Sequence, residues 1–375
     1  MKYFIKELSC LNRRDEIKIL CRKLDAIGYE QVFAPEESDL SFIYTCGSVD
    51  TFVSRSAKTI EEFVKKYKEQ KVIVCGCLPA TCPDLLKRIF GGVTCTPTDF
   101  SALSDACDIQ MTREDMKEVI SSYDENMQIS NIVVVKGCVR KCSYCVISRG
   151  VGSIMSKSLE KIEIEIIDQL SKGVKRFQLL GDSVGDYGID IGLSIEDLLK
   201  RIDAIDEKFE IYIRDFHPFM FLKYYDTIRE LVKKKRLVSL EVPIQSGSER
   251  ILKLMNRPVD VTKLKEKLIE IAQYDCKLGT DLIVGFPSET DEDFDMTMDF
   301  IKKVHFSSIS VNVYSDQPNT ISSKMPEKVN KKKIFTRCMM IHDNGLNAEN
   351  QEYMEYQIGK IFKVEKIAND FEFNI

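Results

Sequence analysis

Three cysteines stand close together in the middle of the chain, directly after an apolar run. Cys138, Cys142 and Cys145 have the spacing Cys-x3-Cys-x2-Cys, and residues 132–135 before them, Ile-Val-Val-Val, indicate a buried strand. Thiolates with this spacing at a strand end can face one point, which is what an iron–sulfur cluster requires. Because only three thiols are offered, the fourth iron of a 4Fe–4S cube would stay free to bind another molecule.

A structural zinc ion and three unrelated buried thiols are the alternatives for this triplet. Structural zinc takes four ligands, most often cysteine and histidine. The histidines of the chain are His217, His305 and His342, all far from the triplet in sequence. The absence of a nearby fourth ligand favours the iron–sulfur cluster.

Three further cysteines occupy equivalent places in the first hundred residues. Strands are predicted at 3–5, 40–44 and 71–75, and one cysteine follows each of them. Any one alone would be interpreted as a small buried hydrophobic residue. Ligands collect at the carboxyl ends of parallel strands, so the set predicts a second cluster site. Its cysteines are Cys10, Cys46 and Cys77.

The elements around the second triplet alternate between strand and helix. Helices are predicted at 15–27, 50–70 and 82–90, with Gly28 closing the first. This alternation predicts a small parallel sheet. Residues 99–130 are polar and mixed, and they are expected to connect two domains, with a helix at 112–122.

From residue 131 onward the same alternation resumes with larger units. A helix is predicted at 158–171, and Thr290 is expected to cap another helix at its start. The predicted strands are 132–135, 177–180, 209–213, 237–243, 280–287 and 309–314. Six strand–helix repeats are too few for a closed eightfold barrel and predict a partial (β/α)6 barrel. The expected fold class is α/β.

Composition is ordinary for a soluble protein, and the cytoplasm is the expected compartment. The chain has 375 residues, 30% of them charged, a net charge of −5, and an N-terminus without the apolar segment of a signal peptide. Thirteen cysteines in a chain of this size indicate reduced thiols that hold metal rather than disulfides. The acidic balance argues against a broad nucleic-acid-binding face.

These features resemble the radical S-adenosylmethionine (SAM) methylthiotransferases over about residues 3 to 345. Residues 243–258 and 281–294 match the family pattern nearly throughout, and residues 9–12, 44–46 and 74–79 match its N-terminal cysteine segments. The resemblance implies SAM, two 4Fe–4S clusters and insertion of sulfur, as a methylthio group, into a C–H bond. It also implies domains at 1–127 (auxiliary cluster), 128–345 (radical SAM barrel) and 346–375 (a short β tail).

The resemblance also implies which residues surround SAM. Tyr144 matches the aromatic residue beside the adenine, and the loop after residue 180 matches one beside the SAM amino group, with Ser183 where the family has Asn. Gln245 and Ser246 stand where side chains can bond the SAM carboxylate or ribose. The full set is Tyr144, Gly181, Asp182, Ser183, Gln245, Ser246, Asp281, Ile283 and Val313. No side-chain acid or base is expected to be catalytic.

The departures from the family favour a polypeptide substrate, possibly a short precursor peptide. Members of the family act on a tRNA adenosine or on a ribosomal-protein aspartate. Val151 and Gln317 stand where the family has arginines, which we expect at the rim of the site. Residues 356–365 resemble the first strand of the family's TRAM recognition barrel, and the sequence ends at Ile375.

The alternatives are a tRNA methylthiotransferase and a non-catalytic iron–sulfur protein. A low-potential electron donor such as flavodoxin or ferredoxin is expected as partner.

Two cysteine triplets predict two clusters. After anaerobic reconstitution we expect about eight irons per chain, falling to about half when Cys138, Cys142 and Cys145 are all replaced by Ala. Iron and acid-labile sulfide analysis measures both values. About four irons in the unchanged protein would contradict the two-cluster prediction.

Overall fold

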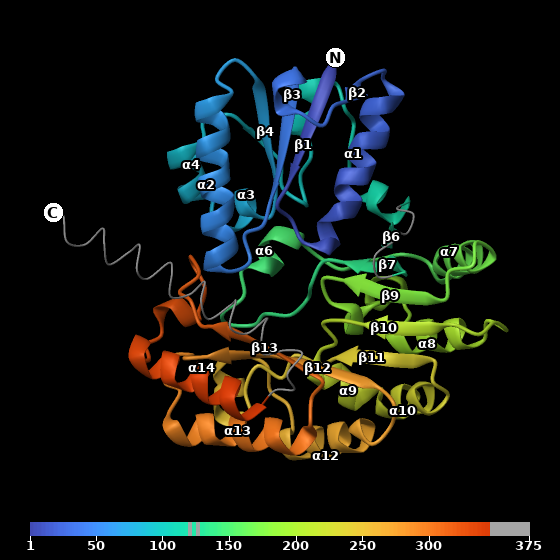
Figure 1. Cartoon of the computed structure of the whole chain (residues 1–375), viewed down its shortest axis with the longest axis vertical. Coiled ribbons are helices and arrows are strands. Elements are labelled where there is room, and N and C mark those ends of the chain that lie inside the picture. The colour runs from blue at the N-terminus through green and yellow to red at the C-terminus, as the bar shows by residue number, and fades with distance from the viewer. Residues whose placement is uncertain (119–121, 125–127, 346–375) are drawn as a thin grey trace. The chain divides into compact units, whose positions relative to one another are not determined.

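The computed structural model describes residues 1–118, 122–124 and 128–345 (Figure 1). These residues form two compact units, each described here by itself. Unit 1 contains Met1–Phe209 and Ser315–Lys324, and unit 2 contains Glu210–Tyr314 and the described residues from Met325 onward. The predicted tail at 346–375 lies outside the described residues, and the predicted domain limits stay a prediction.

A five-stranded parallel sheet forms the first part of unit 1, in the order β2-β1-β3-β4-β5 (Figure 1). Its strands are β1 (Lys2–Glu7), β2 (Glu30–Gln31), β3 (Leu40–Thr45), β4 (Lys71–Gly76) and β5 (Val93–Thr94). All six residues of β3 are buried. A strand covered on both faces has no side exposed to water, which explains why β3, with the sequence Leu-Ser-Phe-Ile-Tyr-Thr, carries no charged residue.

Helices α1 (Arg14–Ala26) and α2 (Asp50–Lys66) cover opposite faces of this sheet (Figure 1). Phe42 of β3 belongs to the core cluster that includes Leu20 and Leu24 of α1. The next residue, Ile43, points to the other face and belongs to the cluster with Ile60 and Phe63 of α2. The smaller helices of this part are η1 (Leu11–Arg13), η2 (Pro35–Glu37), α3 (Leu78–Thr81), α4 (Pro83–Ile89) and α5 (Ala102–Cys107).

The second part of unit 1 is built on β7 (Ile129–Lys136), all of whose residues are buried. It pairs in parallel with β9 (Arg176–Gly181) and antiparallel with β6 (Ser122–Asp124) and β8 (Met155–Ser156). The helices are α6 (Ile147–Val151), α7 (Leu159–Ser171), η4 (Val184–Asp186), η5 (Ile189–Ile191), α8 (Ile195–Asp203) and η6 (Ser322–Lys324). Ser158 caps α7 by accepting a hydrogen bond from the Lys161 amide.

The predicted helix at 112–122 is wrong. The described residues of this stretch, 112–118 and 122, contain a short 3-10 helix, η3 (Glu114–Glu118), and the first residue of β6, Ser122. Pairing of β6 with β7 is a tertiary contact that local sequence does not reveal. A helix that was not predicted, α5, lies in the polar connection and ends where Asp108 adopts a left-handed conformation.

Unit 2 continues the strand–helix alternation with four parallel strands in chain order. They are β10 (Glu210–Ile213), β11 (Leu237–Glu241), β12 (Lys277–Val284) and β13 (Ser308–Val313). Its helices are α9 (Pro218–Lys223), α10 (Tyr225–Lys233), α11 (Glu249–Leu254), α12 (Val261–Ala272), α13 (Asp291–Val304) and α14 (Lys331–Gly345). Thr290 caps α13 in a reciprocal capping box with Asp293, as predicted.

The predicted fold class is confirmed. The chain is α/β, with a small parallel N-terminal sheet and then six parallel strands, β7 and β9 to β13, that alternate with helices. Among the described residues, no helix is long and apolar enough to cross a membrane.

Candidate active site

The loop of Cys138, Cys142 and Cys145 follows directly on β7. Gly137 begins it with φ of +85°, and a Cβ at this position would lie 1.9 Å from the Ser153 carbonyl oxygen, so only glycine fits. The Cys138 amide donates to the Gly152 carbonyl at 3.0 Å, and the Cys145 amide donates to the Cys142 carbonyl at 3.1 Å. These bonds fold the loop so that the three half-buried thiols lie together.

The pKa of the Cys138 thiol depends on burial and on neighbouring groups. This pKa is raised to about 11, mainly by burial and also by the charges of Cys145 and Cys142, while the Arg140 amide and the Ser183 hydroxyl act in the opposite direction. A thiol with a raised pKa is reluctant to ionise alone, and a bound metal overcomes this by coordinating the thiolate. Tyr144 lies half-buried in the turn between Cys142 and Cys145.

The loop after β9 lies beside the Cys138 loop. A Cβ on Gly181 would lie 2.6 Å from the Val135 carbonyl oxygen, so glycine lets β9 approach β7 closely. Asp182 accepts a hydrogen bond from the Gly137 amide at 2.8 Å. Ser183 is buried and donates to Asp186, which also pairs with Arg140 of the Cys138 loop. The predicted residues Gly181, Asp182 and Ser183 therefore come together with the cysteines.

The second triplet meets at one edge of the N-terminal sheet, as predicted. Cys10, Cys46 and Cys77 follow β1, β3 and β4, which are neighbouring parallel strands. The pKa of Cys10 is raised mainly by burial and also by the charge of Cys46, and Cys10 in turn contributes to the raised pKa of Cys77. The thiol of Cys10 is thus within electrostatic reach of both Cys46 and Cys77.

Glycines hold the backbone close behind this triplet. Gly76, with φ of +96°, lies against β3, and a Cβ there would stand 2.4 Å from the Thr45 carbonyl oxygen. Gly47 follows Cys46, and its Cβ would stand 2.1 Å from the Thr81 hydroxyl oxygen. Larger residues at either position would displace the adjacent cysteines.

Neither cysteine triplet is arranged as a single-ion site. A tetrahedral zinc with sulfur at about 2.3 Å brings its ligand atoms to roughly 3.8 Å from one another. Across the described residues, the one group of three or more potential ligands within 4.8 Å of one another is Asp215, Glu241 and Asp281, so neither cysteine triplet is that narrow. Neither triplet therefore has the spacing of a single tetrahedral zinc ion among the described residues.

In unit 2 the predicted SAM-pocket residues lie where β11 ends beside β12. The Gln245 amide donates to the Asp281 carbonyl at 2.8 Å, and the Ile283 amide donates to the Gln245 carbonyl at 3.0 Å. Val313, half-buried, is paired with Val284 on the neighbouring strand β13. The side-chain oxygen Oε1 of Gln245 is buried and has no hydrogen-bond partner among the described residues, so it is available to a ligand.

Ser246 is placed differently from Gln245. Its side chain is buried, accepts a hydrogen bond from the Ser248 amide at 3.2 Å, and lies 3.4 Å from the Thr297 hydroxyl. These contacts favour a role in holding α11 and α13 together over direct contact with SAM.

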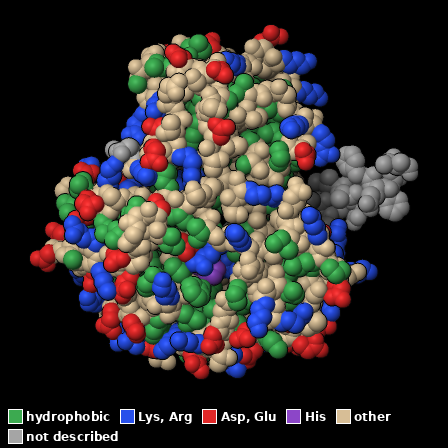
Figure 2. Space-filling model, turned by 180° about the vertical axis from the view of Figure 1, so that it is seen from behind, with side chains coloured by type: hydrophobic (Ala, Val, Ile, Leu, Met, Phe, Trp, Pro, Cys, Tyr) green, Lys and Arg blue, Asp and Glu red, His purple; other side chains and the backbone are tan. Residues whose placement is uncertain are grey.

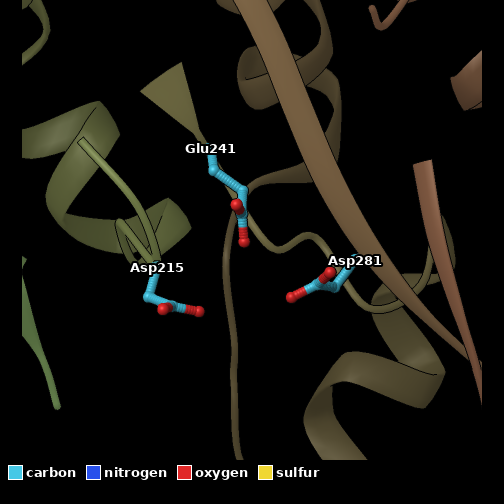
Figure 3. Close-up of side chains that lie close together, drawn as sticks. All are labelled: Asp215, Glu241 and Asp281. Atoms are coloured by element: carbon cyan, nitrogen blue, oxygen red, sulfur yellow. The ribbon is translucent and has the colours of Figure 1, made fainter. Parts of the chain in front are cut away.

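Three carboxylates converge at the same end of the unit 2 strands. Asp215 follows β10, Glu241 ends β11 and Asp281 lies on β12, and their side chains point toward one another (Figure 3). Arg214 donates to Glu241 at 3.1 Å and is the cation paired with the group. Burial, followed by the charges of Glu241 and Asp215, raises the pKa of Asp281 to about 7. We call these three residues the acidic group.

The two positions expected at the rim are buried instead. Val151 is in α6, and the guanidinium of Arg113 donates to its carbonyl oxygen at 3.0 Å. Gln317 donates to the Asp50 carboxylate at 2.7 Å. Because both side chains face the protein interior, their difference from the family does not itself report the charge of the substrate.

Sequence reasoning missed Arg13, Asp215 and Glu241. The strand-end rule that selected the cysteines would have found Asp215 and Glu241, since each stands at or just past the carboxyl end of a strand. Arg13 has no such signal, because its partner Asp182 is 169 residues away in the sequence.

Comparison with known proteins places these features in context. The radical SAM superfamily matches residues 132–301, and the uncharacterized protein family UPF0004 matches residues 2–96. The ribosomal protein uS12 methylthiotransferase RimO of Thermotoga maritima is 30% identical over 347 residues, covering 88% of this chain and 80% of that protein. A probable threonylcarbamoyladenosine tRNA methylthiotransferase of Pyrococcus abyssi is 28% identical over 339 residues, covering 86% and 79%.

Solved structures show the same fold at low identity. The radical SAM methyltransferase TsrM from Kitasatospora setae, with cobalamin and a 4Fe–4S cluster bound, has a TM-score of 0.60 at 12% identity, covering 83% of this chain and 74% of that chain. The cobalamin-dependent radical SAM enzyme OxsB has a TM-score of 0.56 at 10% identity, covering 89% and 55%. These likenesses establish the radical SAM fold.

The raised pKa of Asp281 predicts a pH-dependent effect of Asp281→Asn. Between about pH 4 and about pH 7 the folded chain keeps a proton that the unfolded chain has lost, so this group lowers the free energy of unfolding as pH rises. Asn has no proton to lose. The melting temperature of the apo-variant minus that of the parent should therefore increase from about pH 5 to about pH 8.

Thermal unfolding followed by circular dichroism measures this difference. Asp275→Asn is the control, because Asp275 is exposed and pairs only at the surface with Lys235. A difference for Asp281→Asn that is equal at both pH values would contradict the prediction.

Proposed function

This chain belongs to the radical SAM methylthiotransferase family, and we propose that it inserts a methylthio group into an unactivated C–H bond of a polypeptide in the cytoplasm. Its cofactors are SAM and two 4Fe–4S clusters. We assign one cluster to Cys138, Cys142 and Cys145, and the auxiliary cluster to Cys10, Cys46 and Cys77. When bound, the first supplies the electron that cleaves SAM and the second supplies the sulfur.

The chain's own residues bind and orient these groups. Gly137 and Gly181 allow the backbone of both loops to approach closely, where a side chain would collide with carbonyl oxygens. The free acceptor Oε1 of Gln245 suits a hydroxyl or ammonium group of SAM. Ile283 and Val313 add apolar surface on β12 and β13. No side-chain acid or base is assigned to the hydrogen abstraction.

The acidic group is the observation that carries the choice of a polypeptide. Binding of RNA depends on Lys and Arg contacts to phosphates. The carboxyl ends of the unit 2 strands instead carry three convergent carboxylates and one paired arginine. On the face of the described residues seen in Figure 2, Lys and Arg are interspersed with Asp and Glu and form no continuous basic surface.

Strand pairing is a mode of binding that suits a polypeptide and needs little positive charge. The N-terminal sheet ends in β2 and β5, which have two residues each, so it offers only short edges. Strand β13 is the outermost strand of the unit 2 sheet and has six residues. We propose β13 as the longer edge available to a substrate segment.

The runner-up is a tRNA adenosine methylthiotransferase. It is supported by the relative from Pyrococcus abyssi, whose name states this activity. A low-potential donor such as flavodoxin or ferredoxin is proposed as the electron source for either substrate, because the proposed chemistry starts with one-electron reduction.

The two triplets should separate functionally. Replacing Cys10, Cys46 and Cys77 with Ala should leave reductive cleavage of SAM to 5′-deoxyadenosine but abolish sulfur insertion, because the first cluster keeps its own ligands. Chromatography of 5′-deoxyadenosine and mass spectrometry of the product measure the two steps. Cys276→Ala, in unit 2 and outside both triplets, is the control. Loss of SAM cleavage in a folded variant that still holds about four irons would contradict the assignment.

The substrate is tested directly with three probes. We offer the holoenzyme ribosomal protein uS12, short peptides encoded beside its gene, and bulk tRNA, each with SAM and dithionite. The expected result is a SAM-dependent mass gain of one methylthio group on a polypeptide and negligible tRNA binding at about 0.15 M salt. Methylthiolated adenosine in tRNA, with every polypeptide unchanged, would replace the proposal by the runner-up.

A further inference from the structure

One carboxylate connects the loops of the two cysteine triplets. Arg13, three residues after Cys10, donates two hydrogen bonds from Nη2 to Asp182, at 2.6 Å to Oδ1 and 2.7 Å to Oδ2. The amide of Gly137, the residue before Cys138, donates to Oδ2 of the same carboxylate at 2.8 Å. Asp182 therefore receives hydrogen bonds from both loops at once.

Further contacts join the same two loops. Asn12 donates to the Gly181 carbonyl at 3.3 Å, and Lys136 donates to the Asn12 carbonyl and lies 3.7 Å from Asp15. Also within unit 1, α6 packs against α3, and a Cβ on Gly150 would stand 3.9 Å from that of Cys77. Contacts on two sides thus fix one loop relative to the other within unit 1.

The Arg13–Asp182 pair is buried, with side chains 3% and 5% exposed. Breaking a buried ion pair by removing one partner is costly, because the remaining charge is left without compensation. The second carboxylate on Arg13 is Glu16, whose own pKa is raised by burial. Asp182 is therefore the partner that joins Arg13 to another part of the chain.

Arg13 also lies beside the second triplet. Its amide donates to the Cys10 carbonyl at 2.9 Å, and its side chain is buried in the same loop. A buried cation beside a cluster stabilises whichever state of the site carries more negative charge. For an iron–sulfur cluster that state is the reduced one.

We propose that Arg13 and Asp182 are positioning residues that hold the Cys10 loop against the Cys138 loop, and that Arg13 raises the reduction potential of the auxiliary cluster. The part about the potential rests on the proposed function, whereas the contact between the loops does not. Neither residue touches a reacting atom. They act through the placement and charge of the cysteine ligands.

The first experiment tests the contact in apo-protein by hydrogen–deuterium exchange. Asp182→Asn alters the loop after β9. Exchange of amides should nevertheless become faster, by about tenfold or more, both in the Cys10 loop (9–16) and in the Cys138 loop (137–145). Arg13→Gln should do the same from the opposite side. Arg14→Gln is the matched control, because the adjacent Arg14 is half-exposed and pairs with Glu7 at 2.7 Å. The proposal would be overturned if Asp182→Asn left exchange at 9–16 unchanged and Arg13→Gln left exchange at 137–145 unchanged.

The second experiment measures the reduction potential of the auxiliary cluster alone. The background carries Cys138→Ala, Cys142→Ala and Cys145→Ala, so that one cluster remains and is titrated by electron paramagnetic resonance. Arg13→Gln should lower the reduction potential. Arg13→Lys should lower it much less, because the positive charge remains, and Arg14→Gln should leave it unchanged. A potential in Arg13→Gln equal to that of the background would overturn the electrostatic role.

The outcomes separate this inference from the function it builds on. If no cluster assembles on Cys10, Cys46 and Cys77 in the background protein, the proposed function fails, and the exchange experiment still decides the contact. If the cluster assembles and neither exchange nor potential responds to Arg13→Gln, the positioning role fails and the proposed function stands.

Discussion

Every parallel strand in a series of strand–helix repeats ends at the same edge of its sheet. This constraint underlies the whole protein, because residues far apart in sequence meet at that edge if each follows its strand by a few positions. Cys10, Cys46 and Cys77 meet in this way after β1, β3 and β4. Asp215 and Glu241 come to Asp281 by the same rule in unit 2.

Sequence predicted most of what depends on this constraint. The strands, their alternation with helices and both cysteine triplets follow from apolar runs and from spacing. The helix expected at 112–122 failed because β6 is held by its pairing with β7, which no local pattern encodes. Gln317 and Val151 were expected at the rim because sequence shows which residue is present but not which way it faces, and both are buried.

Polar residues that act over long sequence distances were the hardest to foresee. Arg13 follows Cys10 closely, but its meaning comes from Asp182, on a loop in the other half of unit 1. Gln245 was foreseen from the family pattern, whereas its unpartnered acceptor is visible only when the neighbouring groups are placed. Motifs therefore identify the ligands of a site, and three-dimensional structure identifies the charges that surround them.

The short outer strands of the N-terminal sheet affect how the apo-protein behaves before its clusters are assembled. A sheet edge exposes unpaired amides and carbonyls, which are a template for another chain and a route to aggregation. In β2 and β5 this template is two residues long, and Glu30 and Gln31 in β2 are exposed and polar. The N-terminal sheet of a newly made chain that must wait for iron and sulfide thus presents little edge to other unfinished copies.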